Sequence, residues 1–185
     1  MKQDAFPFPY QVDERTRERA AMVRLVLLDV DGVLTDGRLP LGNDGMELKE
    51  FHIRDGHGIK MLQETGVEVG IISGRSSSIV ERRAGELGIK HVYQGCQDKL
   101  ATVEDLLHRL NQRLTETAFV GDDVVDLPIM LRAGLAVAVN DAHHVVKHYA
   151  HWITPSSGGM GAVRELCDMV MYAQGKYAAM IHRYL

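Results

Sequence analysis

The sequence predicts an α/β fold, in which a doubly wound, Rossmann-like parallel sheet is flanked by helices. Short apolar runs alternate along the chain with segments that are apolar at helical spacing, and this alternation is typical of strand–helix–strand crossovers. The first run, Leu25–Val30, is almost continuously apolar, as expected of a strand buried on both faces of a parallel sheet. The length of 185 residues suits a single domain with a small insertion.

The chain before the first strand is expected to stand apart from this domain. Residues 1–11 carry Pro7 and Pro9 and are interpreted as an irregular arm. The charged segment Asp13–Met22 suits a short solvated helix. We assign no chemistry to residues 1–23, and we interpret 24–185 as one domain.

Beyond the first strand and an insertion, strands and helices are predicted to alternate. A capping box at Ser78–Glu81 begins one helix and Gly88 ends it. Further strands are predicted over Val67–Ile72, Ile89–Tyr93, Thr117–Val120, Leu135–Val139 and His151–Ile153. Helices are predicted over Gly58–Thr65, Ser78–Leu87, Asp98–Leu110, Val125–Ala133, Ala142–His148 and Ala162–Ala173.

The insertion over about residues 37–55 is predicted to be a β-hairpin. Two short runs, Arg38–Leu41 and Met46–Ile53, flank the turn-forming cluster Gly42–Gly45. Apolar residues on such a small flap would leave apolar surface uncovered, which favours burial against another subunit. Packing of the hairpin on its own domain is the alternative, and both stay open at this point.

The composition excludes several classes of partner. The formal net charge is −4, so the chain has no general attraction for nucleic acid or an anionic membrane. No window reaches the roughly 18 apolar residues of a membrane span, and the N-terminus lacks the apolar core of a signal peptide. Cys96 and Cys167 make neither a CxxC motif nor a disulfide framework. We therefore expect a soluble cytoplasmic protein with reduced thiols.

Polar residues suited to phosphate chemistry follow four of the predicted strands. They are Asp29 with Asp31, Ser73–Arg75, Lys99 at the start of a helix, and Gly121–Asp123. Ligands of a parallel sheet bind at the carboxyl ends of its strands, so these residues are expected to converge. Two carboxylates as close as Asp29 and Asp31 cannot both ionise comfortably unless a cation lies between them or one keeps its proton.

In this order, the segments DVDGVLTD, SGR, a lysine opening a helix, and GDDxxD resemble the four motifs of the haloacid dehalogenase superfamily of phosphohydrolases, over about residues 25–140. The segments DGVLTDGR, FHIRDGHGIKML, GDDVVDLP and GGMGAVRE look like a small subgroup that acts on an octulosonate phosphate. In that subgroup a β-hairpin replaces a cap domain and builds a homotetramer. The resemblance implies Mg²⁺-dependent hydrolysis of the sugar phosphate, in lipopolysaccharide precursor synthesis.

The resemblance implies a role for each catalytic residue. Asp29 would be the nucleophile that becomes an aspartyl phosphate. Asp31 would protonate the leaving sugar oxygen and then activate water, which agrees with the chemistry of a second carboxyl two residues on. Ser73 and Lys99 would hold the transferring phosphoryl oxygens.

The resemblance also implies a magnesium site. Asp29, the backbone carbonyl of Asp31 and Asp122 are the expected ligands of Mg²⁺, which prefers oxygen. Asp123 and Asp126 are expected in the outer shell. We rank Asp126 lower, because a surface helical aspartate is the ordinary interpretation.

Substrate recognition is expected to need cations beyond those that meet the phosphate. Arg54 and Arg75 are the candidates, because a guanidinium can grip a carboxylate with two parallel bonds. Gly74 is assigned to the same loop, and Thr35 either binds near the phosphate or caps the turn. Arg38 and Lys49 on the hairpin are further candidates, but a solvated charge is the preferred interpretation of each.

The glycine-rich segment from about residue 156 has two interpretations. Its glycines suit a mobile segment that closes over a site, and in the resembled subgroup the tail reaches a neighbouring subunit's active site. The alternative is a flexible linker to a final helix. His144 and His148 stand at zinc-binding helical spacing, but no third ligand follows, so a solvated helix face is preferred.

Other functions compete with this one. The same motifs fit a phosphatase for another acidic nine-carbon sugar phosphate. A phospho-acceptor signalling domain also carries Asp, Ser or Thr, and Lys at strand ends, but it gains nothing from a proton donor such as Asp31. A non-catalytic assembly module would have lost a catalytic residue, and none is missing.

Overall fold

The strand β1 (Leu25–Leu28) lies at the centre of a six-stranded sheet, and all four of its residues are buried. The structure is a computed structural model that describes residues 8–43 and 46–185. All neighbouring strands pair in parallel, in the order β3-β2-β1-β4-β5-β6. The remaining strands are β2 (Glu68–Ile72), β3 (His91–Tyr93), β4 (Thr117–Gly121), β5 (Leu135–Ala138) and β6 (Trp152–Ile153). This order confirms the predicted doubly wound fold class.

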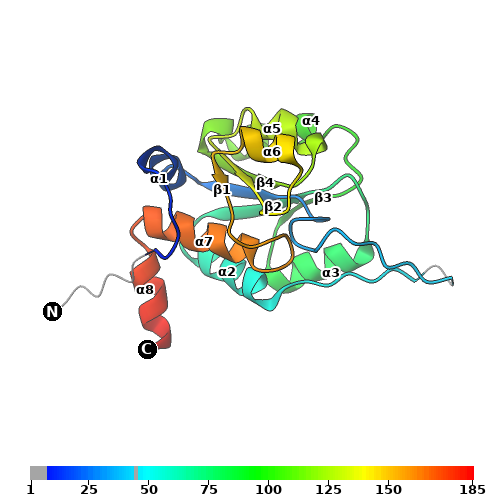
Figure 1. Ribbon diagram of the computed structural model, residues 1–185, viewed down its shortest axis with the longest axis horizontal. Helices are drawn as coiled ribbons and strands as arrows, with labels where there is room; N and C mark the ends of the chain where they lie inside the picture. The colour runs from blue at the N-terminus through cyan, green and yellow to red at the C-terminus, as the bar shows by residue number, and fades with distance from the viewer. Residues whose placement is uncertain (1–7, 44–45) are drawn as a thin grey trace.

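Helices cover both faces of the sheet (Figure 1). One face carries α2 (Ile53–Glu64), α3 (Ser78–Leu87) and α7 (Ala162–Ala173), and the other carries α4 (Lys99–Leu110), α5 (Leu127–Met130) and α6 (His144–Tyr149). Shorter elements complete the described part of the chain: α1 (Glu14–Ala21), α8 (Tyr177–Ile181), η1 (Leu114–Glu116), η2 (Val124–Asp126) and η3 (His182–Tyr184). None of the helices described is both long and apolar enough to cross a bilayer.

Local capping explains where several helices begin and end. The carboxylates of Asp13 and Asp98 each accept a hydrogen bond of 3.0 Å from a backbone N–H in the first turn of α1 and α4. Gly88 ends α3 at φ +71°. The predicted capping box is one residue too late, since Ser77 is the N-cap and its hydroxyl accepts from the N–H of Ile79 at 3.3 Å.

Helix α2 differs most from its prediction, because it begins at Ile53 instead of Gly58. Glycines lower helix propensity, so Gly56 and Gly58 suggested a later start. Here they allow close packing instead. A Cβ at Gly58 would lie 2.6 Å from the Arg164 side chain on α7, and a Cβ at Gly56 would collide with Arg83 of α3.

Other differences are smaller. The helix predicted over 125–133 is divided into η2 and a short α5, and α8 after Gly175 was not predicted. In the N-terminal arm, Phe8 and Tyr10 pack near Trp152 and Tyr172, with ring centroids 5.5 Å apart for Phe8 and Tyr172. Residues 1–7 of the predicted arm lie outside the described residues.

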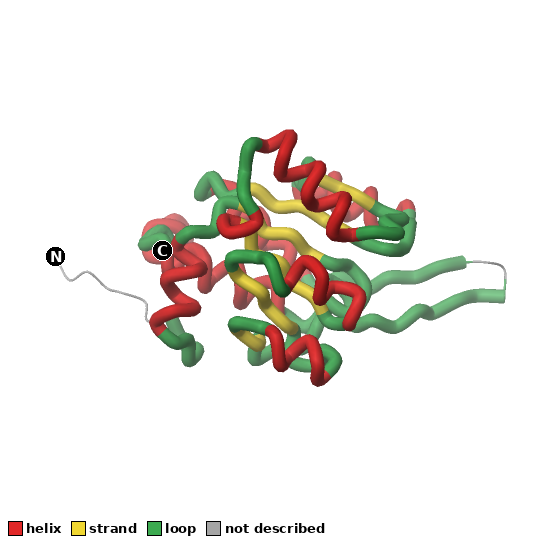
Figure 2. The backbone as a smooth tube through the Cα atoms, turned by 90° about the horizontal axis from the view of Figure 1, so that it is seen from above, coloured by secondary structure: helices red, strands yellow, loops and turns green. Residues whose placement is uncertain are grey.

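The predicted hairpin is an arm of two extended loop segments that projects from the domain (Figure 2). These segments meet in one antiparallel bridge between Leu41 and Glu47, and Gly42 N–H donates to the Met46 carbonyl at 2.9 Å. Asp44 and Gly45 of the predicted turn lie outside the described residues. The arm ends earlier than predicted, since Ile53 already belongs to α2.

Candidate active site

The predicted strand-end residues meet at the topological switch point of the sheet. Asp29 follows β1 and Asp122 follows β4, and these two strands are neighbours from which the chain winds in opposite directions. Ser73 follows β2, and Lys99 is the first residue of α4. The Asp29 N–H donates to the Val120 carbonyl at 3.1 Å, so the parallel pairing continues up to the first aspartate.

Lys99 ties two of these segments together. Its Nζ lies 2.7 Å from Asp29 Oδ2 and 2.8 Å from Asp126 Oδ1. All three side chains are buried. Burial opposes the charged form of Lys99, but the two carboxylates outweigh it and raise the pKa of Lys99 above its usual value. The lysine is therefore a fixed cation beside Asp29.

Asp126 is not the surface residue that we expected. It is fully buried, because the single turn of η2 directs it inward under β4. Its Oδ2 accepts from the N–H groups of Asp122 at 3.0 Å and Asp123 at 3.4 Å, while Oδ1 meets Lys99. Asp126 thus holds the turn that carries Asp122. Asp123 itself is exposed and caps η2 through Val124 N–H at 2.7 Å.

The acidic cluster carries more negative charge than the described side chains neutralise. Carboxylate oxygens of Asp29, Asp122 and Asp126 lie within 4.8 Å of one another, and Lys99 is the cation among them. Burial, with help from Asp126, raises the pKa of Asp29 to about 6. Burial, with Asp126 and Asp29, raises the pKa of Asp122 to about 7. Without further positive charge, the folded chain favours protons on these groups.

These residues fit a divalent cation. Asp122 has no side-chain hydrogen bond or ion pair with the described residues, so its oxygens are available as ligands. A carboxylate set of this kind suits Mg²⁺, and a divalent cation would neutralise the cluster. Gly32 keeps this space open, because a Cβ there would collide with the Asp122 carboxylate. Its φ of +89° also favours glycine.

Asp31 lies outside this cluster. Its carboxylate is paired with Lys49 of the arm, and its Oδ2 lies 3.5 Å from Arg75 Nε. The turn at Gly32 therefore separates two aspartates that are two residues apart in sequence. Asp29 is held by Lys99, and Asp31 is held by Lys49 and Arg75.

Lys49 is not the solvated charge that the sequence interpretation preferred. Its side chain is 1% exposed, and its Nζ also lies 3.5 Å from Glu47 Oε1. Counted with their backbone atoms, Glu47, Lys49 and Phe51 are half-buried along the arm, whereas Met46, Leu48 and Glu50 are exposed. This period of two was visible in the sequence, since Lys49 shares a face with Phe51.

The other predicted residues near the aspartates differ in how far they are buried. Thr35 is buried, and its hydroxyl accepts from the N–H groups of Gly32 at 3.4 Å and Gly37 at 3.3 Å, so it caps the turn. Ser73 is also buried. Gly74 is exposed beside it, and Arg75 is half exposed.

Arg54 is a predicted site residue that the described contacts do not connect to the other site residues. It is exposed in the first turn of α2. Within the described residues it forms no hydrogen bond or ion pair. Arg54 could therefore contribute to substrate binding only through a contact that is not made among the described residues of this chain.

The glycine-rich segment is neither a free lid nor a loose linker within this chain. Gly159 N–H donates to the Val33 carbonyl at 2.9 Å, and Gly158 N–H donates to Asp141 Oδ1 at 2.9 Å. A Cβ on Gly158 would collide with the Gly32 carbonyl. The segment therefore packs directly on the turn that separates the two aspartates.

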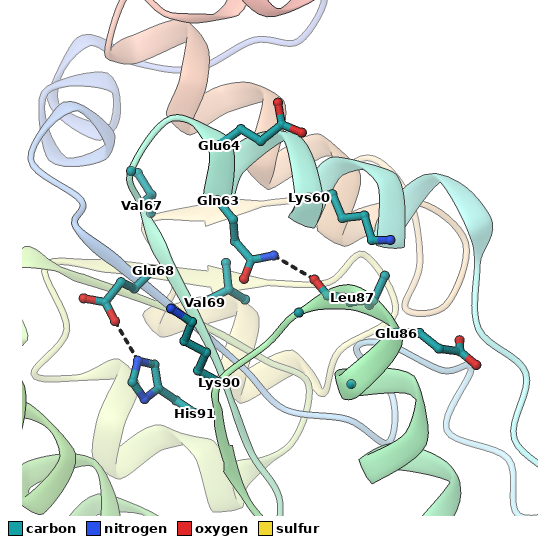
Figure 3. Close-up of a pocket in the computed structure, with 13 residues that line it drawn as sticks. Lys60, Gln63, Glu64, Val67, Glu68, Val69, Glu86, Leu87, Lys90 and His91 are labelled. Atoms are coloured by element: carbon teal, nitrogen blue, oxygen red, sulfur yellow. Dashed lines mark hydrogen bonds and ion pairs between the residues drawn. The ribbon is translucent and has the colours of Figure 1, made fainter.

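A broad hollow lies elsewhere, between α2 and α3 beside the beginning of β2 (Figure 3). Two pairs of its polar groups interact, as His91 Nε2 lies 2.6 Å from Glu68 Oε2 and Gln63 donates to the Leu87 carbonyl at 2.9 Å. It contains none of the predicted site residues. The chemistry-bearing groups gather at the opposite, carboxyl ends of the strands.

Comparison with known proteins gives one consistent family. A model described as haloacid dehalogenase-like hydrolase matches residues 92–166. A 3-deoxy-D-manno-octulosonate 8-phosphate phosphatase from Yersinia pestis is 48% identical over 159 residues, covering 86% of this chain and 85% of that protein.

Two solved structures are similar over most of the chain. The phosphatase of the same name from Moraxella catarrhalis, in complex with magnesium, phosphate and KDO, is 38% identical with a TM-score of 0.90, covering 92% of this chain and 98% of that one. The cobalt-bound deoxy-D-mannose-octulosonate 8-phosphate phosphatase from Haemophilus influenzae is 42% identical with a TM-score of 0.83, covering 86% and 93%.

Magnesium affinity is predicted to rise with pH. Protons must leave Asp29 and Asp122, whose pKa values are about 6 and about 7, before both can act as ligands. Binding measured by titration calorimetry should therefore be about tenfold tighter at pH 8 than at pH 6. Asp105→Asn, at an exposed aspartate outside the cluster, should keep this dependence, and Asp122→Asn should weaken it. Equal affinity at both pH values would contradict the proposed ligands.

Gly158→Ala is predicted to disturb the aspartate turn, because the new Cβ must displace the Gly32 carbonyl. We expect a loss of about 2 kcal/mol in the free energy of unfolding, measured in urea, together with weaker Mg²⁺ binding. Gly85→Ala is the matched control, since a Cβ there meets nothing within 4 Å in the interior of α3. If Gly158→Ala and Gly85→Ala had the same free energy of unfolding and the same Mg²⁺ affinity, the packing argument would fail.

Proposed function

The chain belongs to the haloacid dehalogenase-like hydrolases, and we propose that it hydrolyses 3-deoxy-D-manno-octulosonate 8-phosphate to the free sugar acid and phosphate. The observation that carries this proposal is the buried Asp29, held 2.7 Å from Lys99 beside Asp122 and Asp126 at the end of the central strand. The names and high identity of the relatives support the choice of substrate. The reaction would supply a sugar acid for lipopolysaccharide precursors.

The first half of the reaction transfers the phosphoryl group to the protein. An oxygen of Asp29 attacks phosphorus, and the bond between phosphorus and the sugar oxygen breaks. Asp31, entering as the acid, gives its proton to that oxygen, so the sugar leaves as an alcohol. The product on the protein is an aspartyl phosphate.

The second half restores the protein. Asp31, now a carboxylate, takes a proton from a water molecule as that water attacks the phosphorus. The bond to Asp29 breaks, inorganic phosphate leaves, and Asp31 is again an acid. Because the structure separates Asp29 from Asp31 and gives each its own lysine, the two carboxyls can keep different roles.

Charge on the phosphoryl group would be met from several sides. Lys99 would neutralise one oxygen, and the hydroxyl of Ser73 would donate to another. Bound Mg²⁺ supplies further neutralisation of the phosphate, as metal ions do in phosphoryl transfer. We assign it to Asp29, the backbone carbonyl of Asp31 and Asp122.

Outer residues would hold this arrangement in place. The hydrogen bonds of Asp126 with Lys99 and with the Asp122 backbone fit an outer-shell role. Asp123 contributes by capping η2. Arg75, half exposed beside Asp31, is the candidate for the substrate carboxylate, with Gly74 leaving room beside it and Thr35 shaping the turn. Arg54 would act from its exposed position on α2.

We also propose that the arm assembles four copies of the chain. Leu41, Met46 and Leu48 on the arm are 70%, 54% and 53% exposed, which is a large apolar surface for a narrow segment. Burial of this surface against another copy would remove it from water. A cytoplasmic location agrees with the two free thiols, Cys96 and Cys167.

Phosphate release from a panel of sugar phosphates, with and without Mg²⁺, tests the function. We expect the octulosonate phosphate to be the preferred substrate, and the reaction to require Mg²⁺. Asp29→Asn should abolish turnover without unfolding the protein, because the nucleophile is lost. Retained activity in Asp29→Asn would overturn the mechanism.

Asp31→Asn separates the proposal from a signalling domain. Severely slowed hydrolysis is expected, because the leaving oxygen loses its proton donor. A longer-lived phosphoprotein with no small-molecule hydrolysis in either form would favour the signalling function.

Light scattering at micromolar concentration tests the assembly. The wild type should have the mass of four chains, and Leu41→Glu with Leu48→Glu should reduce it, because charges would enter the buried interface. Leu131→Glu, at an exposed leucine outside the arm, is the control. A stable wild-type monomer would count against the tetramer.

A further inference from the structure

We propose that Lys49 is a positioning residue for Asp31, so that the base of the arm orients the proton donor within the same chain. This inference rests on the proposed phosphatase function. Lys49 belongs to the arm, and its side chain points away from the arm's apolar, outward face. The inference gives this residue an effect on catalysis.

The Lys49 ammonium has been taken almost entirely out of water. Its side chain is 1% exposed and is paired with the Asp31 carboxylate, with Glu47 at 3.5 Å. A buried ammonium is costly unless carboxylates surround it. The fold therefore keeps Lys49 at this position through its contact with Asp31, and the contact constrains both side chains.

Two basic and two acidic side chains form a cluster at the base of the arm. Lys49 and Arg75 are the basic members, and Asp31 and Glu47 are the acidic members. Arg75 lies 3.5 Å from each of the two carboxylates. A hydrogen bond with Ser77, together with Lys49 and Arg75, lowers the pKa of Glu47, so Glu47 stays anionic. The cluster is thus complete without Asp29.

Lys49 constrains Asp31 more than Arg75 does. The guanidinium of Arg75 is 49% exposed and approaches Asp31 no closer than 3.5 Å, and water weakens such a pair. Lys49 is buried and in direct contact with the other carboxylate oxygen. Lys49 therefore sets the direction of the carboxyl, while Arg75 stays accessible to a substrate anion.

This position predicts a dependence on the leaving group. A sugar oxygen is a poor leaving group and needs the proton from Asp31, whereas 4-nitrophenolate leaves readily without one. Misplacing Asp31 should therefore lower kcat/KM for the sugar phosphate and spare kcat/KM for 4-nitrophenyl phosphate, because this ratio covers only the steps up to formation of the aspartyl phosphate. Hydrolysis of the aspartyl phosphate, in which Asp31 activates water, is common to both substrates and affects kcat alone. A loss of folding or of phosphate binding would slow both.

The test compares Lys49→Met, which keeps the apolar stem, with Lys60→Met, which removes an exposed lysine at the hollow of Figure 3. With the octulosonate phosphate and saturating Mg²⁺, kcat of Lys49→Met should fall on the order of 100-fold, with KM changed by less than about threefold. Its kcat/KM with 4-nitrophenyl phosphate should fall by less than about threefold. Lys60→Met should match wild type with both substrates.

A double-mutant cycle, measured with the sugar phosphate, tests independently whether Lys49 acts through Asp31. If Lys49 acts through Asp31, then adding Lys49→Met to Asp31→Asn should cause no further loss of kcat. Lys49→Arg, which keeps the positive charge, should recover part of the kcat that Lys49→Met loses. If the unfolding midpoint shows that Lys49→Met does not fold, Lys49→Arg takes its place in the cycle.

Several results would overturn the inference. Equal losses of kcat/KM with both substrates would indicate a structural role, and a rise in KM alone would indicate substrate binding. Multiplying losses in the cycle would show that Lys49 acts independently of Asp31. These outcomes are distinct from failure of the proposed function, in which the wild type would not hydrolyse the sugar phosphate at all.

Discussion

The buried contact of Lys99 with Asp29 and Asp126 is the constraint on which the rest of the site depends. It joins the end of β1, the start of α4 and the turn after β4, three segments that are remote in sequence. One ammonium cannot balance the three carboxylates of the cluster, and burial makes the excess charge costly. The raised pKa values of Asp29 and Asp122 and the fit to a divalent cation both follow from this imbalance.

The arm shows how one strand can serve two purposes. Successive side chains of an extended segment point to opposite sides, so Glu47 and Lys49 face the catalytic turn while Met46 and Leu48 face outward. The inward face holds Asp31 away from Asp29, and the outward face supplies the proposed contact between chains. A change in assembly would therefore act on the same segment that we propose to orient Asp31.

Much of the fold could be predicted because its signals are local. Apolar runs mark the strands. The bounds of α3 and α7 agree with their predicted ranges, and α3 ends at the predicted Gly88. The start of α2 could not be found in this way, because Gly56 and Gly58 oppose helix formation locally and are explained only by their packing on Arg83 and α7. Tertiary packing outweighed propensity there.

For the site, the sequence by itself determined which polar residues follow which strands, and the parallel topology then placed Asp29, Lys99 and Asp122 together. Only the tertiary structure decided that Asp126 is buried, that Lys49 pairs with Asp31, and that Gly158 packs on the aspartate turn. These features depend on contacts between distant segments, such as Lys99 with Asp126 at a separation of 27 residues. Local periodicity reports which face a residue occupies, but the partner that it meets is set by how the segments pack.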